Sequence, residues 1–282
     1  MQAASSLLAR EGIQNGALGL LGKGDDSVAF AAGGVVVRVR STTPDRERLS
    51  GAWRAAIELC VREPSLVVAP LELSDGSLLA ELSGFTLSLW PLAPGKRCSG
   101  RSEGVRRLGA DTLARLHLAA AGLAGPRAVE EGDLLDELPG ELRDRELEGW
   151  WARRSVTRTL LIHGDFYPGN LLRSRRGISV VDWDEAHVGD STRELAWAVW
   201  EFCHTDGGTR LNSEAAKRFL DTYAQKAGGL PAELPEHLVP IVRRHLAFEM
   251  ARSLRAVRTG QWAWLDPGYF HAERQAFLNL RG

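Results

Sequence analysis

Several kinds of residue that define whole classes of protein are scarce in this chain. Its 282 residues include only three cysteines, Cys60, Cys98 and Cys203, which are odd in number and too widely spaced for a zinc knuckle or a CxxC redox pair. No apolar run approaches the ~20 residues of a membrane-spanning helix, and the first residues lack the basic start and apolar core of a signal peptide. We therefore expect three separate thiols in a cytoplasmic protein with no membrane partner.

An excess of charge of either sign is also absent. The chain has 35 basic and 36 acidic residues and a net charge of −1, so no overall field favours nucleic acid or an anionic membrane. Hydrophobic residues at 44% and charged residues at 25% are ordinary for a soluble globular protein. The length allows one large domain or two lobes.

Residues 1–90 have the patterns of a sheet with one helix. Two strands are expected within 17–40, where "VAFAA" and "VVVRVR" flank the hairpin signal Gly33-Gly34. A polar loop with glycines precedes the first of them, and a helix is expected over 44–62. Further strands are expected where the chain reads "SLVVAPLEL" (65–73), "SLLAEL" and "FTLSLWPL".

The composition changes after residue 90. Residues 91–104, "PLAPGKRCSGRSEG", are rich in Pro, Gly and Ser and predict a connector. Beyond it helical spacing predominates, and Ser191 with Glu194 has the form of a capping box. The expected helices cover 104–123, an acidic insert at 130–148, 190–203, 214–227 and 236–259. We therefore predict an α+β fold, with a β-rich lobe at 1–90 and a mainly α-helical lobe at 105–282.

Polar side chains gather within "LIHGDFYPGNLLRSRRGISVVDWDEAHVGD" (161–190). Asp165 follows a predicted strand, and Asn170 lies five residues later. Asp182 ends the strand "ISVV", and a hairpin can bring it back beside Asn170. A carboxylate and an amide oxygen, with room for waters and phosphates, form the usual kind of Mg²⁺ site. His163 is interpreted as a histidine that organises the backbone.

The spacing H-x-D-x4-N, followed by an apolar strand that ends in Asp, parallels the catalytic loop and metal-binding Asp of kinase-type phosphoryl transfer. "HGDFYPGN" and "VVDWDEAHVGD" resemble the aminoglycoside phosphotransferase and choline kinase-like family, and "SLWPLAPG" and "LARLH" match as well. The resemblance implies a protein-kinase-like bilobal fold with ATP or GTP bound between the lobes. By position, Asp165 would be the catalytic base, and Asn170 and Asp182 would be the Mg²⁺ ligands.

The resemblance extends to residues around this motif. Asp184 and Asp190 match the acidic positions that follow the metal-binding Asp, and we assign them supporting roles together with His163. His117, in "LARLH", is interpreted as a scaffold residue.

The phosphates of a nucleotide need backbone N–H groups and a fixed positive charge. "GKGDDSVAF" can supply the N–H groups through Gly22, Gly24 and Ser27, although it lacks the P-loop pattern. In "VVVRVR", Arg38 stands where protein kinases usually have Lys, and Arg40 on the same face is the second candidate.

The glutamate that should pair with this charge from the following helix is ambiguous. Glu47 and Glu58 are both candidates, and the best-fitting register places Trp53 there instead. The sequence leaves this ion pair undecided.

The phosphate acceptor is expected to be a small hydroxylated molecule, such as an antibiotic, a nucleoside, an amino alcohol or a sugar. From residue 190 onward the chain has 11 acidic and 12 basic side chains, and 238–259 is basic, which slightly disfavours a highly cationic acceptor. The acidic insert would favour a cation if it faced the cleft. Trp262 and Trp264 are suited to stacking on a flat or sugar-like ligand. The choices between ATP and GTP, monomer and homodimer, and resistance and metabolism remain open.

Two other classes compete with a kinase. A metal-dependent hydrolase would use H-x-D and D-x-D at a two-metal site, but the seven histidines show no second metal-spaced pair and the glycine loop would have no purpose. A catalytically silent kinase-like binding module is the other alternative. The joint presence of Asp165, Asn170 and Asp182 argues against it.

Overall fold

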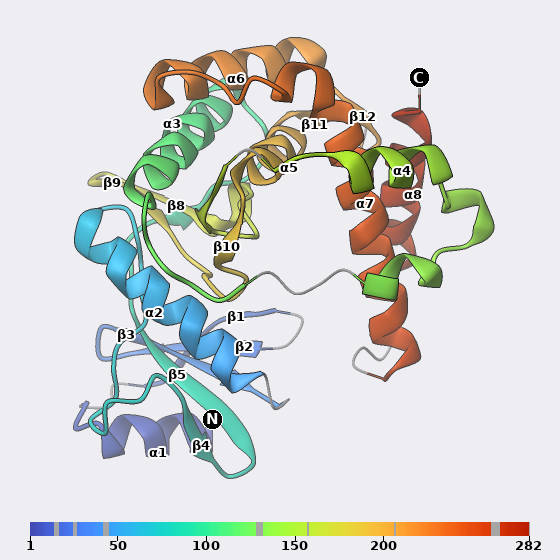
Figure 1. Cartoon of the computed structure of the whole chain (residues 1–282). Coiled ribbons are helices and arrows are strands. Elements are labelled where there is room, and N and C mark those ends of the chain that lie inside the picture. Colours follow the sequence, from blue (N-terminus) through green and yellow to red (C-terminus); the bar gives the residue numbers. More distant parts are fainter. Residues whose placement is uncertain are drawn as a thin grey trace.

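The computed structural model describes residues 1–13, 17–24, 27–41, 45–127, 132–156, 158–205, 207–260 and 266–281. In Figure 1 a short first helix and the sheet of the N-terminal region lie at the bottom of the view, and most helices of the second half lie above them. A sheet-rich N-terminal region and a mainly helical C-terminal region confirm the predicted fold class. The limits of the two lobes and their connector stay a prediction.

The N-terminal region is built on a five-stranded antiparallel sheet with the strand order β1-β2-β3-β5-β4. Its strands are β1 (Gly19–Lys23), β2 (Ser27–Ala32), β3 (Val35–Arg40), β4 (Ala80–Leu82) and β5 (Phe85–Pro91). The predicted turn between β2 and β3 is confirmed, with φ of 58° at Gly33 and 82° at Gly34. Such positive values favour glycine, because it lacks a Cβ.

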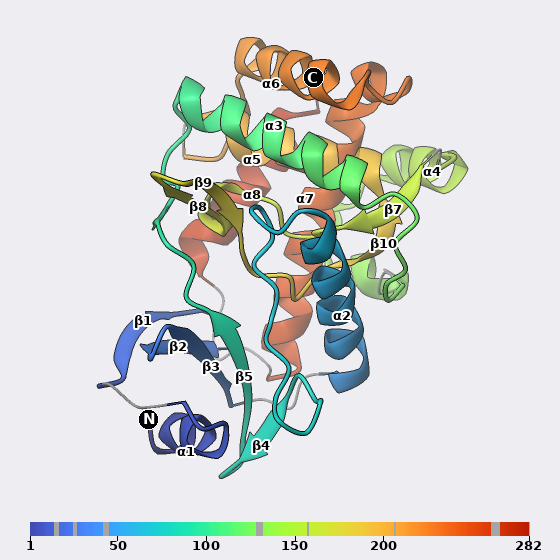
Figure 2. The ribbon, with the colours of Figure 1, turned by 90° about the vertical axis from the view of Figure 1, so that its left-hand side faces the viewer.

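A helix that the sequence pattern did not predict, α1 (Gln2–Arg10), packs under this sheet (Figure 2). Ala4, Leu7 and Leu8 have the spacing of an amphipathic helix, and all three are fully buried in a cluster that includes Val37 of β3. The helix is short and half of its apolar face is alanine, so the pattern in the sequence is weak.

The helix α2 (Arg46–Arg62) packs on the other side of the sheet. Asp45 caps it by accepting the backbone N–H of Arg48 at 3.0 Å. Trp53 is fully buried and packs edge-on against Trp90 of β5, with ring centroids 5.1 Å apart. The helix predicted over 44–62 is therefore confirmed from Arg46 onward, and Pro44 lies outside the described residues.

The strand predicted over 65–73 is wrong. Only isolated bridges form here, from Val67 to Val180 and from Leu71 to Leu89. Pro70 has no N–H for a strand ladder. The segment instead links the N-terminal sheet to a strand of the C-terminal region.

The C-terminal region combines long helices with short strand pairs. Its helices are α3 (Glu103–Ala119), α4 (Arg145–Arg153), α5 (Ser191–Cys203), α6 (Ser213–Ala227), α7 (Leu234–Arg258) and α8 (Pro267–Asn279). Its strands are β6 (Lys96–Arg97), β7 (Thr159–Ile162), β8 (Leu171–Ser174), β9 (Gly177–Val180), β10 (His187–Asp190), β11 (His204–Thr205) and β12 (Arg210–Leu211). α3 packs along α6, and β6, which falls inside the predicted connector, pairs with β8.

The predicted capping box at the start of α5 is wrong. Asp190 is the N-cap, because its carboxylate accepts the N–H of Thr192 at 2.9 Å. The hydroxyl of Ser191 lies 3.3 Å from a backbone carbonyl outside the helix. Glu194 is therefore available for another contact.

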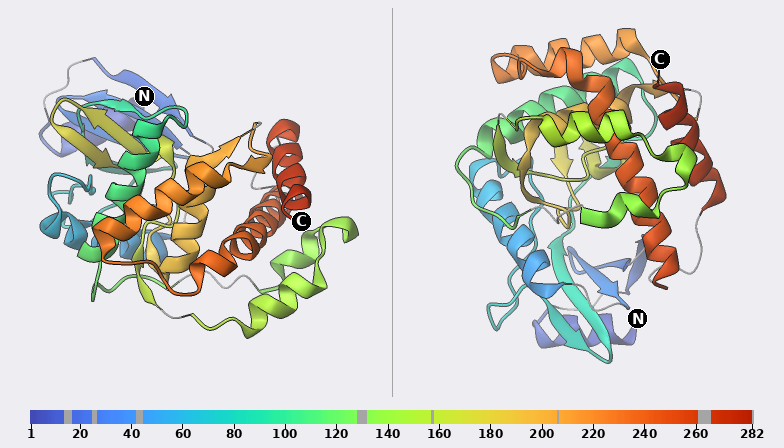
Figure 3. Two further views of the ribbon diagram at one scale, coloured as in Figure 1. Left: turned by 90° about the horizontal axis from the view of Figure 1, so that it is seen from above. Right: turned by 45° about the vertical axis from the view of Figure 1, so that its right-hand side comes forward.

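The acidic insert at 130–148 is only partly helical. It contains two 3-10 turns, Gly132–Glu137 and Gly140–Leu142, before α4 begins. Figure 3 shows these turns and α4 alongside α7 and α8. The carboxylates of the insert form ion pairs with four of the five arginines of α7, which are Asp144 with Arg243, Glu148 with Arg244, and Glu137 with Arg255 and Arg258.

The described residues contain three cysteines and no disulfide bond. Cys60, Cys98 and Cys203 are unpaired, as predicted. Over the described ranges, every helix is too short or too polar to cross a membrane.

Candidate active site

The loop that carries Asp165 begins where β7 ends, beside the paired strand β10. Gly164 there has φ of 84°, and a Cβ on it would lie 2.2 Å from the carbonyl oxygen of Glu185. Only glycine fits this position. The N–H of Gly164 donates to a carboxylate oxygen of Glu194 on α5 at 2.7 Å.

Two buried histidines hold this loop in place. Nε2 of His117 lies 2.7 Å from Glu194, and its Nδ1 lies 2.7 Å from the hydroxyl of Tyr223. Nε2 of His163 lies 3.0 Å from the carbonyl oxygen of Val181. His117 and His163 thus contact the scaffold, as the sequence indicated for both.

Asp165 and Asn170 are in direct contact. Nδ2 of Asn170 donates to the carbonyl oxygen of Asp165 at 2.9 Å and to its carboxylate at 3.0 Å. Because the amide nitrogen is used in this way, Oδ1 of Asn170 points away from Asp165. Its contact within the described residues is with Arg97 at 3.4 Å.

Asp182 is brought beside this pair by the β8–β9 hairpin, as predicted. The N–H of Val181 donates to the carbonyl oxygen of Asn170 at 3.0 Å. Asp182 has φ of 69°, a left-handed backbone that is rare outside glycine and typical of functional sites. Its side chain is 35% exposed.

The electrostatic environment of both carboxylates is unfavourable to charge. Burial raises the pKa of Asp165 well above its usual range, and the carboxylates of Asp182 and Glu249 raise it further. Burial also raises the pKa of Asp182, although Arg38 opposes this shift. A bound cation would relieve both penalties, and the oxygens of Asn170 and Asp182 are the ligand types that Mg²⁺ prefers.

Arg38 lies across from this loop, on β3. Nη1 is 3.1 Å from the Asp182 carboxylate, and Nη2 is 3.5 Å from the hydroxyl of Ser27. The guanidinium also lies over the ring of Trp90, 5.6 Å from its centroid. Five of the predicted site residues are therefore brought together, which are Ser27, Arg38, Asp165, Asn170 and Asp182.

The ion pair that the sequence left undecided is made with Asp184. Nη2 of Arg38 lies 2.8 Å from the Asp184 carboxylate, and Arg40 also pairs with it. Nε1 of Trp53 donates to the same carboxylate at 2.8 Å. Glu47 and Glu58 are exposed on α2, and among the described residues neither pairs with Arg38.

The glycine loop is described in part. Gly22 and Gly24 are exposed, and the N–H of Gly24 donates to the carbonyl oxygen of Ser27 at 2.8 Å. Asp25 and Asp26, between Gly24 and Ser27, lie outside the described residues. So do Trp262 and Trp264.

Sequence reasoning missed a group of carboxylates near Asp165. Glu201 of α5, Glu249 of α7 and Glu273 of α8 lie close enough to repel one another. Burial raises the pKa of Glu201 to about 7 and that of Glu273 to about 8. Neither carboxylate oxygen of Glu273, a residue 5% exposed, has a well-aligned hydrogen bond within the described chain, although the nearby Tyr269 hydroxyl opposes the rise in its pKa. Three separate helices contribute these residues, so no local motif signals them.

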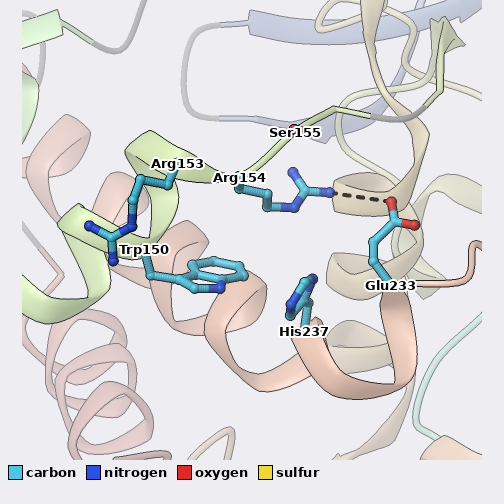
Figure 4. A pocket seen from close by; sticks show the side chains of 6 residues that line it. All are labelled: Trp150, Arg153, Arg154, Ser155, Glu233 and His237. Atoms are coloured by element: carbon cyan, nitrogen blue, oxygen red, sulfur yellow. Dashed lines mark ion pairs between the residues drawn. The ribbon is translucent and has the colours of Figure 1, made fainter.

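Asp190 lies apart from the site. It pairs with Arg154, and on β10 it stands opposite Thr159, at the end of β7 remote from Asp165. A cavity of about 290 Å³ lies beside Arg154 (Figure 4), lined by Trp150, Arg153, Arg154, Ser155, Glu233 and His237. Asp190 therefore supports α5 and this neighbourhood rather than the loop of Asp165.

Curated relatives match this chain over short stretches. The thiamine kinase of Shigella boydii serotype 4 (strain Sb227) is 36% identical over 73 residues, which are 26% of this chain and 23% of that protein. The protein LicA homolog of Mycoplasma capricolum subsp. capricolum is 35% identical over 63 residues, which are 22% and 24% of the two chains. The match thus spans about a quarter of the length of these relatives.

Solved structures match over nearly the whole chain. A choline/ethanolamine kinase family protein from Mesorhizobium loti has a TM-score of 0.70 at 18% identity and covers 99% of this chain and 92% of its own. A microcompartment-associated aminopropanol kinase has a TM-score of 0.69 at 16% identity, with 98% and 94% covered. An amicoumacin kinase in complex with AMP-PNP and Ca²⁺ has a TM-score of 0.68 at 12% identity, with 94% and 86% covered. At these identities the likeness shows a shared fold.

The family itself is shown by a broader match. A model of the phosphotransferase enzyme family matches residues 27–237, well over half of the chain. That range includes β3 with Arg38, the loop with Asp165 and the hairpin that ends at Asp182. The resemblance found in the sequence is confirmed: the chain belongs to the phosphotransferase enzyme family and has the fold of small-molecule kinases.

Proposed function

We propose that this chain transfers the γ-phosphoryl group of ATP or GTP to a hydroxyl group of a small molecule that carries an amine. One observation carries the proposal. Asp165 and Asn170 lie on one loop, the β8–β9 hairpin returns Asp182 to that loop, and the guanidinium of Arg38 contacts Asp182.

The nucleotide end of the site is assigned to the N-terminal region. Arg38 offers a planar fork that suits phosphate oxygens, and its side chain is 13% exposed, so the charge is only partly screened by water. The glycine loop precedes β2 and would lie over the phosphates. Its N–H groups would supply further donors.

The metal end is assigned to Asn170 and Asp182. Oδ1 of Asn170 and the carboxylate of Asp182 would hold Mg²⁺, which neutralises the charge of the β- and γ-phosphates when it is bound. Asn170 keeps its orientation through the two hydrogen bonds that it donates to Asp165.

Asp165 is assigned as the general base. Its carboxylate would accept the proton of the acceptor hydroxyl while that oxygen attacks the γ-phosphorus. The bond from the γ-phosphorus to the bridging oxygen then breaks, and the nucleoside diphosphate leaves. The raised pKa of Asp165 makes its carboxylate a stronger proton acceptor.

An amine on the acceptor is favoured by the carboxylates around Asp165. Glu201 pairs with Arg101 and Glu249 pairs with Arg252, whereas no ion pair to Glu273 forms within the described residues, and an ammonium group would supply its counter-ion. The arginines of α7 cancel this charge only in part, because those at 243, 244, 255 and 258 pair with the acidic insert, whereas Arg252 pairs with Glu249. The structure thus favours a cationic acceptor more than the count of charges in the sequence does. Names of similar proteins include choline/ethanolamine kinase and aminopropanol kinase, which agrees with this class.

The test is a nucleotide-consumption screen with ATP and GTP, each with Mg²⁺. Matched acceptor pairs, such as an amino alcohol and the diol of the same length, separate the amine from the hydroxyl. We expect phosphorylated product only from acceptors with an amine, and none with Asp165→Asn. Release of free phosphate without acceptor dependence would indicate a hydrolase. Nucleotide binding without turnover on any acceptor would indicate a silent binding module.

A further inference from the structure

We propose that Asp184 is the positioning residue for the phosphate-binding arginine, in the place that a helix glutamate was expected to fill. The inference rests on the proposed function, because it concerns how Arg38 is presented to a nucleotide. It assigns Asp184 a role distinct from that of Asp182, two residues earlier in the same loop.

The carboxylate of Asp184 is occupied by donors from the N-terminal region. Nη1 of Arg38 donates to Oδ1 at 3.1 Å and Nη2 donates to Oδ2 at 2.8 Å, which makes a bidentate pair. Arg40 also donates to Oδ2, and Nε1 of Trp53 donates to Oδ1 at 2.8 Å. A carboxylate has about four acceptor positions, so these contacts leave Asp184 little capacity for a metal ion.

The side chains around Asp184 are largely buried, so water screens their ion pairs and hydrogen bonds only weakly. The side chains of Arg38, Arg40 and Asp184 are 13%, 3% and 16% exposed, and Trp53 is fully buried. Two arginines on the same face of β3 repel each other, and Asp184 supplies the negative charge between them. Trp53 fixes the carboxylate from α2, because its ring is held edge-on by Trp90.

Asp184 also limits the number of hydrogen bonds that Arg38 makes with Asp182. Arg38 uses Nη1 and Nη2 on Asp184, so its contact with Asp182 is a single hydrogen bond at 3.1 Å. Without Asp184, Arg38 would be free to turn fully onto Asp182. The guanidinium would then compete with the cation for that carboxylate and be withdrawn from the phosphates.

The arrangement joins two regions of the chain. β3 and α2 belong to the N-terminal region, whereas Asp184 follows Asp182 in the C-terminal region. A single carboxylate therefore sets the position of the phosphate-binding arginine relative to the metal site. In the pairing expected from protein kinases, strand and helix would set that position within one region.

The experiment is a double-mutant cycle on nucleotide affinity, measured by calorimetry with AMP-PNP and no acceptor. We expect Asp184→Asn to weaken AMP-PNP binding about ten- to a hundred-fold, the range for losing charge-assisted hydrogen bonds. In an Arg38→Ala background the same change should cost less than about threefold, because the residue acts through Arg38. Additive losses in the cycle would overturn the proposal.

Matched controls come from the helix glutamates. Glu47→Gln and Glu58→Gln should each leave AMP-PNP affinity within about twofold of the unaltered chain. A loss with either of them as large as that of Asp184→Asn would return the role to the helix. The midpoint of a Mg²⁺ titration should rise in Asp184→Asn, and an unchanged midpoint would contradict the assigned competition for Asp182.

A second variant covers the case in which Asp184→Asn does not fold. Trp53→Phe keeps an aromatic ring and removes one donor to Asp184, so affinity should fall several-fold, and only when Arg38 is present. Unchanged affinity in Trp53→Phe overturns the proposal. If the unaltered chain binds no nucleotide, both the proposed function and this inference are wrong. If the losses in the cycle are additive, the inference alone is wrong.

Discussion

The carboxylate of Glu194 lies 2.7 Å from the backbone nitrogen of Gly164 through one oxygen and 2.7 Å from Nε2 of His117 through the other. Glu194 is on α5 and His117 is on α3, and His117 in turn contacts Tyr223 of α6. The loop that carries Asp165 is therefore attached to three helices through one buried polar chain. The attachment explains how so short a loop can keep a fixed conformation.

Glu194→Ala should destabilise the protein and the site together. The change leaves the N–H of Gly164 and Nε2 of His117 buried without a partner, and each buried polar group left unsatisfied costs about 1–3 kcal/mol. Urea denaturation followed by circular dichroism measures the loss. The matched control is Glu214→Ala, which removes an exposed pair with Arg218 and should cost no more than about 1 kcal/mol. Equal losses would mean that the chain of hydrogen bonds does not support the loop.

Asp165→Asn should abolish turnover while nucleotide binding is retained. The amide keeps the shape of the side chain but cannot accept a proton, and loss of a general base typically lowers the rate by ~10²–10⁴. Steady-state kinetics with an amine-bearing acceptor and calorimetry with AMP-PNP give the two readouts. Activity within a few-fold of the unaltered chain would exclude Asp165 as the base.

Asp182→Ala should remove the dependence of nucleotide binding on Mg²⁺. The change deletes the charged member of the proposed ligand pair, Asn170 and Asp182. AMP-PNP titrations with and without Mg²⁺ should then coincide, and turnover should be lost. A variant that still binds more tightly with Mg²⁺ would place the ligand elsewhere.

Arg38→Ala and Arg40→Ala should separate phosphate binding from stability. Arg38 faces Asp182 and Ser27, so its loss should raise the nucleotide KM, lower kcat and reduce kcat/KM about ten- to a hundred-fold. Arg40 is 3% exposed and pairs with Asp184, so its loss should affect kcat/KM less and the melting temperature more. Parallel kinetics and thermal unfolding test the ranking. The opposite ranking would shift the phosphate contact to Arg40.

Local patterns predicted the parts of this structure that depend on local rules. The Gly33-Gly34 turn, the helix α2 and the hairpin that returns Asp182 to Asn170 each follow from spacing within a few residues. The pairing of Arg38 with Asp184 could not be predicted in this way. These residues are 146 positions apart, and packing of Trp53 rather than sequence spacing selects the partner.

The charge around the proposed acceptor site could not be predicted from local sequence patterns either. The segment 238–259 is basic by composition, yet four of its arginines pair with the acidic insert, Arg252 pairs with Glu249, and Glu249 itself lies near Asp165. A count of charges over the segment ignores which face of the helix each side chain occupies. Which face of α7 meets the site depends on how α4 and α8 pack against it, and that is a property of the tertiary structure.

Glu273→Gln should stabilise the protein at alkaline pH and not at acidic pH. Burial raises the pKa of Glu273 to about 8, so the fold favours the protonated carboxyl. The associated stability is fully present below the pKa of the unfolded chain and is lost as pH rises through about 8. Glutamine has the same shape and no charge, so the variant should gain on the order of 1–3 kcal/mol at pH 9 and little at pH 5. Thermal unfolding at the two pH values, with exposed Glu236→Gln as the control, measures the difference. An equal gain at both pH values would show that the charge of Glu273 is not the cause.

The same titration predicts that the KM for an amine-bearing acceptor falls as pH rises from 6 to 8.5, because an ionised Glu273 attracts the ammonium group. Glu273→Gln should flatten this profile.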